Sequence, residues 1–155
     1  MSHVRKLVRD GIADLLDANK VLYSSVYRSR VQSTRQVMPY VMIFSEGESD
    51  EVISVCDPTV YNRTISINVI GLLKMPTGSD TQTIEDKMDD MAVEIENKIT
   101  GGALRALVPS VQTLRLTSTI LEVVITTDDT ISHAEITIKM EVGCATTEGV
   151  SSSLI

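Results

Sequence analysis

The stretch Thr83–Gly102, TIEDKMDDMAVEIENKITGG, decides how the rest of the chain folds. Its apolar side chains recur at the three- and four-residue spacing of one helical face, at Ile84, Met88, Met91, Ala92, Ile95 and Ile99. Thr83 is the predicted N-cap, the first turn is acidic, and Gly101-Gly102 is the expected stop of the helix. This apolar face must cover another apolar surface, which the strand-like segments on either side can supply.

A second helix is predicted over Ser2–Asn19, capped by Ser2, with its apolar face formed by Val4, Leu7, Val8, Ile12, Leu15 and Leu16. Thr64–Lys74, TISINVIGLLK, alternates as a half-buried strand does, and Leu114–Thr127 and Ser132–Gly143 are expected to pair as an antiparallel hairpin. We therefore predict an α+β fold: a mostly antiparallel sheet with two main helices packed on one face, plus an extended β arm or long loop. Residues 1–143 are predicted to form a single domain, and residues 144–155 a flexible C-terminal tail.

Two polar segments lie between the first helix and the strand Thr64–Lys74. Val21–Val37 is basic and β-prone, and it carries Arg28, Arg30 and Arg35. We interpret it as a solvated edge strand that its arginines protect, or as a basic face that meets an acidic partner surface. After Pro39 and the short apolar strand YVMIF, we interpret Ser45–Arg63 as a long solvated loop, whose acidic residues are Glu46, Glu48, Asp50 and Glu51.

The composition argues against several classes of protein. The net charge of −7 opposes binding to nucleic-acid phosphates, and the 3% of aromatic residues is too few for a base-stacking platform. Cys56 and Cys144 are interpreted as free thiols of a reducing compartment, with a single disulfide as the alternative. The sequence has no apolar run of membrane-spanning length and no signal-peptide pattern, so we expect a soluble protein made in a cytoplasm.

No residue pattern of an active site is present. The only histidines are His3, near the terminus, and His133, beside the predicted hairpin turn. The sequence lacks the phosphate-binding, dinucleotide-binding and nucleophile-elbow motifs, and its acidic clusters lack the spacing of a calcium loop. We therefore expect a binding or structural protein with no enzymatic activity, no cofactor and no metal site.

The order of these elements resembles the tail terminator family of long-tailed bacteriophages, which includes proteins like minor tail protein U. The resemblance lies in the segments VRKLVRDGIADLLD, MPYVMIF, RTISINVIGLLK, IEDKMDDMAVEIENKI and LTSTILEVVITTDDTISHAEITIKMEV, and it covers most of residues 2–143. It is a likeness of pattern and order rather than of a signature motif. The longer Ser45–Arg63 segment and the C-terminal tail depart from the family.

The resemblance implies a virion structural protein, a hexameric ring that caps the tail tube, ends its polymerisation and provides the head-to-tail attachment surface. Its partners are then further copies of the chain, the tail tube protein and a head-completion or neck protein, and genome DNA passes through the channel without specific binding. Such a protein assembles in the host cytoplasm and resides at the head-proximal end of the tail, with no membrane partner. The alternatives are a neck or head-completion connector of related fold, and a small cytosolic enzyme with an unrecognised site.

Within such a ring, charge suggests which surfaces meet. We predict contacts of Arg28, Arg30 and Arg35 with an acidic surface on the adjacent copy, either the acidic helix or the run containing Glu46, Glu48, Asp50 and Glu51.

Overall fold

The computed structural model describes residues 3–30, 38–55, 57–74, 83–124 and 133–147. In these ranges the helices are α1 (Val4–Asp17), α2 (Ile84–Lys98) and α3 (Gly101–Leu107). The strands are β1 (Ser25–Tyr27), β2 (Tyr40–Ser54), β3 (Val60–Lys74), β4 (Val111–Val124) and β5 (His133–Thr147). The predicted α+β class is confirmed.

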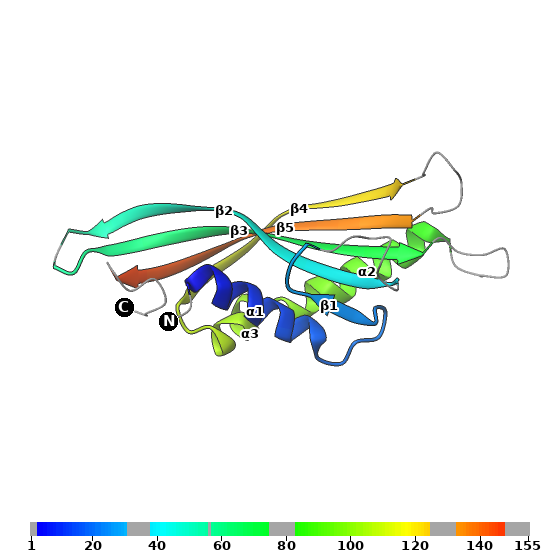
Figure 1. Ribbon diagram of the computed structural model, residues 1–155, viewed down its shortest axis with the longest axis horizontal. Coiled ribbons are helices and arrows are strands. Elements are labelled where there is room, and N and C mark those ends of the chain that lie inside the picture. The colour runs from blue at the N-terminus through cyan, green and yellow to red at the C-terminus, as the bar shows by residue number, and fades with distance from the viewer. Residues whose placement is uncertain (1–2, 31–37, 56, 75–82, 125–132, 148–155) are drawn as a thin grey trace.

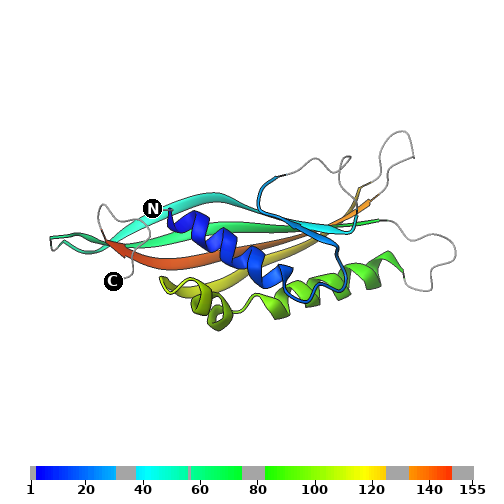
Figure 2. The same ribbon diagram turned by 60° about the horizontal axis from the view of Figure 1, so that its bottom comes forward.

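The described strands form one sheet in the order β1-β2-β3-β5-β4. The short strand β1 runs parallel to β2, whereas the β2–β3, β3–β5 and β5–β4 pairs are all antiparallel. The helices lie together against one face of this long, twisted sheet, as Figures 1 and 2 show from two directions. Strands β4 and β5 are the predicted C-terminal hairpin, and β5 lies between β3 and β4 in the sheet.

The hydrophobic core lies between the helices and the two central strands. Val69 of β3 pairs with Ile138 of β5, and both side chains are fully buried, as are Met91 and Ile95 of α2. At Gly71 an added Cβ would lie 2.8 Å from the Sδ atom of Met91, so α2 passes over β3 where the strand has no side chain. The predicted packing of the helix 84–99 on the strands 64–74 and 134–142 is confirmed.

The start of α2 follows the prediction, but its end does not. Thr83 is the N-cap, and its side chain accepts a hydrogen bond from the backbone N–H three residues later. The helix ends at Lys98, before the two glycines, so the prediction that Gly101-Gly102 stops it is wrong. Thr100 caps a new helix instead, and Gly101 and Gly102 form its first turn. The N-cap signal of a threonine therefore outweighs the C-terminal signal of the glycines.

The N-terminus of α1 is capped by His3 rather than by the predicted Ser2. The helix begins at Val4, and the Nδ1 atom of His3 accepts a hydrogen bond of 3.1 Å from the backbone N–H of Arg5. Ser2 lies outside the described residues. An imidazole nitrogen can serve here because it offers the same acceptor that a serine oxygen would.

The predicted loop at Ser45–Arg63 is wrong, because most of this segment is strand. β2 continues to Ser54 and β3 begins at Val60, and the two strands pair with each other as a long hairpin. The side chains of this part are mostly exposed or half-buried, so the strand has no apolar face to reveal it in the sequence. Backbone hydrogen bonds to β3 hold it in the sheet instead.

The structure also changes the predicted bounds of two other segments. Within Val21–Val37, strand β1 covers only Ser25–Tyr27, and residues 31–37 lie outside the described part of the chain. Strand β5 continues through Thr147, so the first four residues of the predicted tail 144–155 belong to the sheet. Residues 148–155 lie outside the described residues.

Replacing glycine by alanine should change the stability of the protein in opposite directions at two positions. In α1 an added Cβ at Gly11 would lie 2.8 Å from the Cγ2 atom of Val108 and 3.1 Å from the Cδ1 atom of Leu104, so Gly11→Ala should destabilise the fold by about 1–3 kcal/mol through overpacking. Nothing lies within 4 Å of the same position at Gly102, where Gly102→Ala should stabilise α3 by about 0.5 kcal/mol. Urea denaturation of both variants measures the difference, and a stabilising Gly11→Ala would contradict the close packing of α1 on α3.

Candidate subunit interface

A hairpin arm extends past the N-terminal end of α1, at the left end of the molecule in Figure 1. It consists of residues 49–54 of β2 and 60–64 of β3, which pair from Ser49↔Thr64 to Ser54↔Val60. Strand β5 pairs along the other side of β3 as far as Val60↔Thr147. The arm is therefore supported by β5 on its β3 side, while its β2 side has no neighbouring strand among the described residues.

Arg63 fixes two of the acidic residues that were predicted to face another subunit. Its Nη1 atom lies 2.6 Å from the Oε1 atom of Glu48 and 3.3 Å from the Oδ2 atom of Asp50. Its Nε atom donates a hydrogen bond of 2.7 Å to the Oγ1 atom of Thr146, which is fully buried. Glu48 and Asp50 are thus bound within their own chain, whereas Glu46 and Glu51 are exposed on β2.

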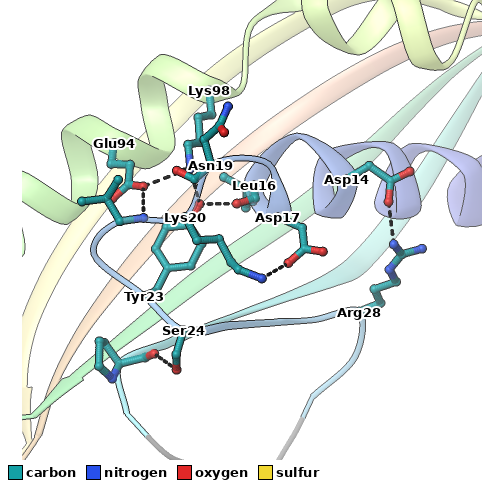
Figure 3. Close-up of polar contacts among 12 residues, drawn as sticks. Asp14, Leu16, Asp17, Asn19, Lys20, Tyr23, Ser24, Arg28, Glu94 and Lys98 are labelled. Carbon is teal, nitrogen blue, oxygen red and sulfur yellow. Dashed lines mark hydrogen bonds and ion pairs between the residues drawn. The ribbon is translucent and has the colours of Figure 1, made fainter.

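The basic residues predicted to reach an adjacent copy also have contacts within the chain. The Nη2 atom of Arg28 lies 2.5 Å from the Oδ1 atom of Asp14, and its Nη1 atom lies 3.7 Å from Asp10, so this arginine lies along α1 (Figure 3). The guanidinium of Arg30 lies over the ring of Phe44, 4.3 Å from the ring centroid. Arg35 lies outside the described residues.

A polar junction ties the connection between α1 and β1 to helix α2 (Figure 3). The Nζ atom of Lys98 lies 3.0 Å from the Oε1 atom of Glu94 and 3.1 Å from the Oη atom of Tyr23, which itself donates to the carbonyl of Leu16 at 2.6 Å. Glu94 also accepts from the backbone N–H of Leu22 at 3.1 Å. Burial raises the pKa of Tyr23; for Lys98, burial acts to lower the pKa, but the hydrogen bonds to Glu94 and Tyr23 raise it overall.

This junction was missed in the sequence, although part of its signal was there. Glu94 and Lys98 are four residues apart on a predicted helix, the spacing of a favourable ion pair. Nothing in the local pattern indicated that Tyr23 would join them from a segment more than 70 residues earlier. The junction holds the start of the basic segment against α2, and Arg28, later in the same segment, is held beside α1 by its own ion pair with Asp14.

Strand β4 forms one side of the sheet, and large apolar side chains are exposed along it. Leu116, Ile120, Leu121 and Val123 are each between 40% and 48% exposed. Ile120 and Leu121 are consecutive and therefore point to opposite faces of the strand. Leu114–Thr127 was predicted only as a strand of the C-terminal hairpin, and this exposure was not predicted, although two adjacent large apolar residues already depart from the alternation of a half-buried strand.

The histidines, cysteines and acidic clusters were the other candidates for catalysis or metal binding. Within the described ranges, no group of three or more His, Cys, Asp or Glu side chains could hold a metal ion. The Nε2 atom of His133 lies 3.0 Å from the Oε1 atom of Glu135. Cys144 is a buried free thiol, and burial raises its pKa to about 11, so it stays protonated at neutral pH. Cys56 is outside the described residues, and none of the described helices is long and apolar enough to span a membrane.

The fold has a counterpart among solved structures. No protein family and no curated protein matches the chain. A chain of a solved structure described as "Virion of native gene transfer agent (GTA) particle" matches with a TM-score of 0.51 and 11% sequence identity. The match covers 89% of this chain and 94% of the other. The two chains therefore share one fold over nearly their whole lengths.

Proposed function

We propose that this protein is a structural subunit of a phage-like virion, and specifically a tail terminator. In this proposal a ring of six copies caps the tail tube, ends its polymerisation and gives the head its surface of attachment. The observation that carries the proposal is the fold shared with a chain of the gene transfer agent virion, which extends over 89% of this chain and 94% of that one. The order and pattern of the elements, which resemble the tail terminator family, support the more specific role.

The surface chemistry is compatible with a ring. A cyclic assembly uses heterologous contacts, so each subunit needs two different complementary surfaces. In this proposal the arm and the opposite side of the sheet at β4 supply the two surfaces, and Glu46, Glu51 and the half-exposed Arg28 are predicted contact residues. A chain with a net charge of −7 also lets DNA pass, because its surface repels phosphates more than it binds them.

The proposal is tested by growing tail tubes from their purified subunits with and without this protein and imaging both by electron microscopy. Tubes grown with it should stop at a uniform length and carry a six-fold ring at one end, because the bound ring blocks further addition. Tubes grown alone serve as the control and should vary in length. A ring found on the head portal rather than the tube would favour the neck connector, and unchanged tubes with bare ends would overturn the terminator role.

A further inference from the structure

A cavity of about 270 Å³ opens on the helix side of the sheet, where β3 ends. Its apolar lining comes from the connection between α1 and β1, from the residue before β2 and from the end of β3, and it consists of Val21, Leu22, Pro39 and Leu73. Leu73 belongs to the hydrophobic core and is 7% exposed, whereas Val21 is 80% exposed. The cavity therefore leads from an exposed apolar rim to a wall of the core.

Hydrogen bonds within the chain hold the walls of this cavity. The carboxylate of Glu94 accepts from the backbone N–H groups of Val21 at 3.2 Å and Leu22 at 3.1 Å, which fixes the connection on α2 (Figure 3). The backbone N–H and the hydroxyl of Ser24 both donate to the carbonyl of Pro39, at 2.9 Å and 3.0 Å. Because these walls are already fixed, a partner that enters the cavity need not order them.

The size of the cavity suits one side chain rather than a whole small molecule. Sites that enclose a drug-sized ligand usually have volumes of about 300–1,000 Å³ and several polar groups that orient the ligand. This cavity falls below that range, and most of its lining residues are apolar. It is closer to the pockets of protein interfaces, each of which encloses an aromatic or aliphatic anchor of the partner.

The charge around the cavity differs from that of the chain as a whole. Its charged residues are Lys74, Lys87 and Asp90, so the local balance is positive, whereas the net charge of the chain is −7. Lys74 is exposed, and its ammonium group has no ion pair among the described residues. A carboxylate beside the inserted side chain can pair with this ammonium, while the acidic surface elsewhere repels an acidic partner.

The position of the cavity separates it from the surfaces that the proposed ring uses. It lies at Lys74, the last residue of β3, whereas the arm contains the first, Val60, and these ends are about 45 Å apart at the usual rise of a strand. Helix α2 separates it from β4, because Glu94 binds the connection on one side of the helix and Glu96 contacts Thr119 of β4 on the other. A ring that uses the arm and β4 leaves this cavity open to another protein.

We propose that this cavity is a docking site for a protein other than this chain, which inserts one large apolar side chain flanked by carboxylates. The apolar side chain lies between Val21 at the rim and Leu73 at the core, and a carboxylate pairs with Lys74. That the partner is a different protein rests on the proposed function, because a virion subunit binds proteins besides its own copies. The shape and charge of the cavity do not depend on that function.

Tryptophan fluorescence tests the site directly, because this chain contains no tryptophan. Two short peptides each carry one tryptophan in a serine and glycine background, flanked by glutamates in one and by lysines in the other. When the purified protein is added, the emission of the acidic peptide should shift to shorter wavelength and saturate, because the indole leaves water. The basic peptide should bind at least about threefold more weakly.

Two pairs of variants locate the binding. Val21→Asp should weaken the acidic peptide at least about fivefold, whereas Val93→Asp makes the same change at a 55% exposed residue outside the cavity and should not. Lys74→Glu should reverse the preference between the two peptides, whereas Lys6→Glu, the same reversal at an exposed lysine of α1, should leave it unchanged. Circular dichroism confirms that each variant is folded.

The other outcomes of this experiment decide against the site. Equal binding of both peptides, or equal losses in Val21→Asp and Val93→Asp, would overturn it. A peptide with the sequence of residues 49–55 is compared, as a competitor, with the acidic peptide carrying leucine in place of tryptophan. Stronger displacement by residues 49–55 would show that the arm of a second copy is the occupant, which contradicts the proposal.

The test also separates this site from the ring function, because the peptides bind a single subunit in solution. Absence of any shift at millimolar protein would overturn the docking site, and rings on tail tubes would still support the tail terminator. Binding with the expected variant effects would support the docking site, and tubes with bare ends would then contradict only the tail terminator role.

Discussion

Ile138→Ala should lower the free energy of unfolding by about 2–5 kcal/mol, and Ile95→Ala should have an effect of the same size. Both side chains are fully buried, Ile138 at the centre of β5 and Ile95 on the face of α2 that packs on the sheet. Truncation removes apolar contacts and leaves a cavity that the surrounding strands and helix can fill only in part. Urea denaturation monitored by circular dichroism measures the loss.

Ile120→Ala is the matched control for this prediction. It makes the same chemical change on β4, where the side chain is 48% exposed in the monomer, so it should cost less than about 1 kcal/mol. Losses of similar size at Ile138 and Ile120 would show that burial does not govern stability here. A loss below about 1 kcal/mol at both Ile95 and Ile138 would place the core elsewhere.

The buried part of the fold could be predicted because its residues carry strong periodic signals. Ile65, Ile67 and Val69 alternate along β3, and Met91 and Ile95 lie on one face of α2, so burial leaves the same pattern in the sequence as in the structure. The helix boundaries were less predictable. Thr100 and Gly101 carry both a start and a stop signal, and in the structure the start is used, because the side chain of Thr100 accepts a hydrogen bond from the backbone N–H of Ala103.

The arm could not be predicted from the sequence, because its residues carry no such periodic signal. Residues Ser49–Ser54 are mostly exposed, so no apolar alternation marks them as a strand, and their acidic character favours a loop. Their conformation comes from backbone pairing with β3, a contact between residues that are separate in the sequence. The preference of these residues for a loop is overridden because a neighbouring strand supplies hydrogen bonds to their backbone.

The candidate contact residues show a related limit of prediction from the sequence. A charged residue in a sequence reveals its sign but not its partner. Glu48 and Asp50 were assigned to another subunit, yet Arg63 binds both from the facing strand of the same hairpin. Arg28 likewise binds Asp14 of α1. The exposed apolar residues of β4 were missed because apolar character predicts burial, and only the order of strands in the sheet shows that β4 has no second neighbour among the described residues.

Arg63→Ala should destabilise the protein by about 2–4 kcal/mol and loosen the arm. The side chains of Arg63 and Glu48 are only 15% and 12% exposed, so removing the guanidinium leaves a largely buried carboxylate without its cation. The fully buried hydroxyl of Thr146 loses its hydrogen bond at the same time. Urea denaturation measures the loss, and amide hydrogen exchange should become faster in residues 49–54 and 60–64.

Arg115→Ala separates this effect from the loss of any ion pair. Its guanidinium lies 2.5 Å from Glu141 but is 72% exposed, so its removal should cost at most about 1 kcal/mol. In the double variant Arg63→Ala, Glu48→Ala the uncompensated carboxylate is absent, so the loss should be smaller than the sum of the two single losses. If Arg63→Ala costs no more than Arg115→Ala, or if exchange in the arm is unchanged, then backbone pairing alone holds the arm and Arg63 has no structural role in it.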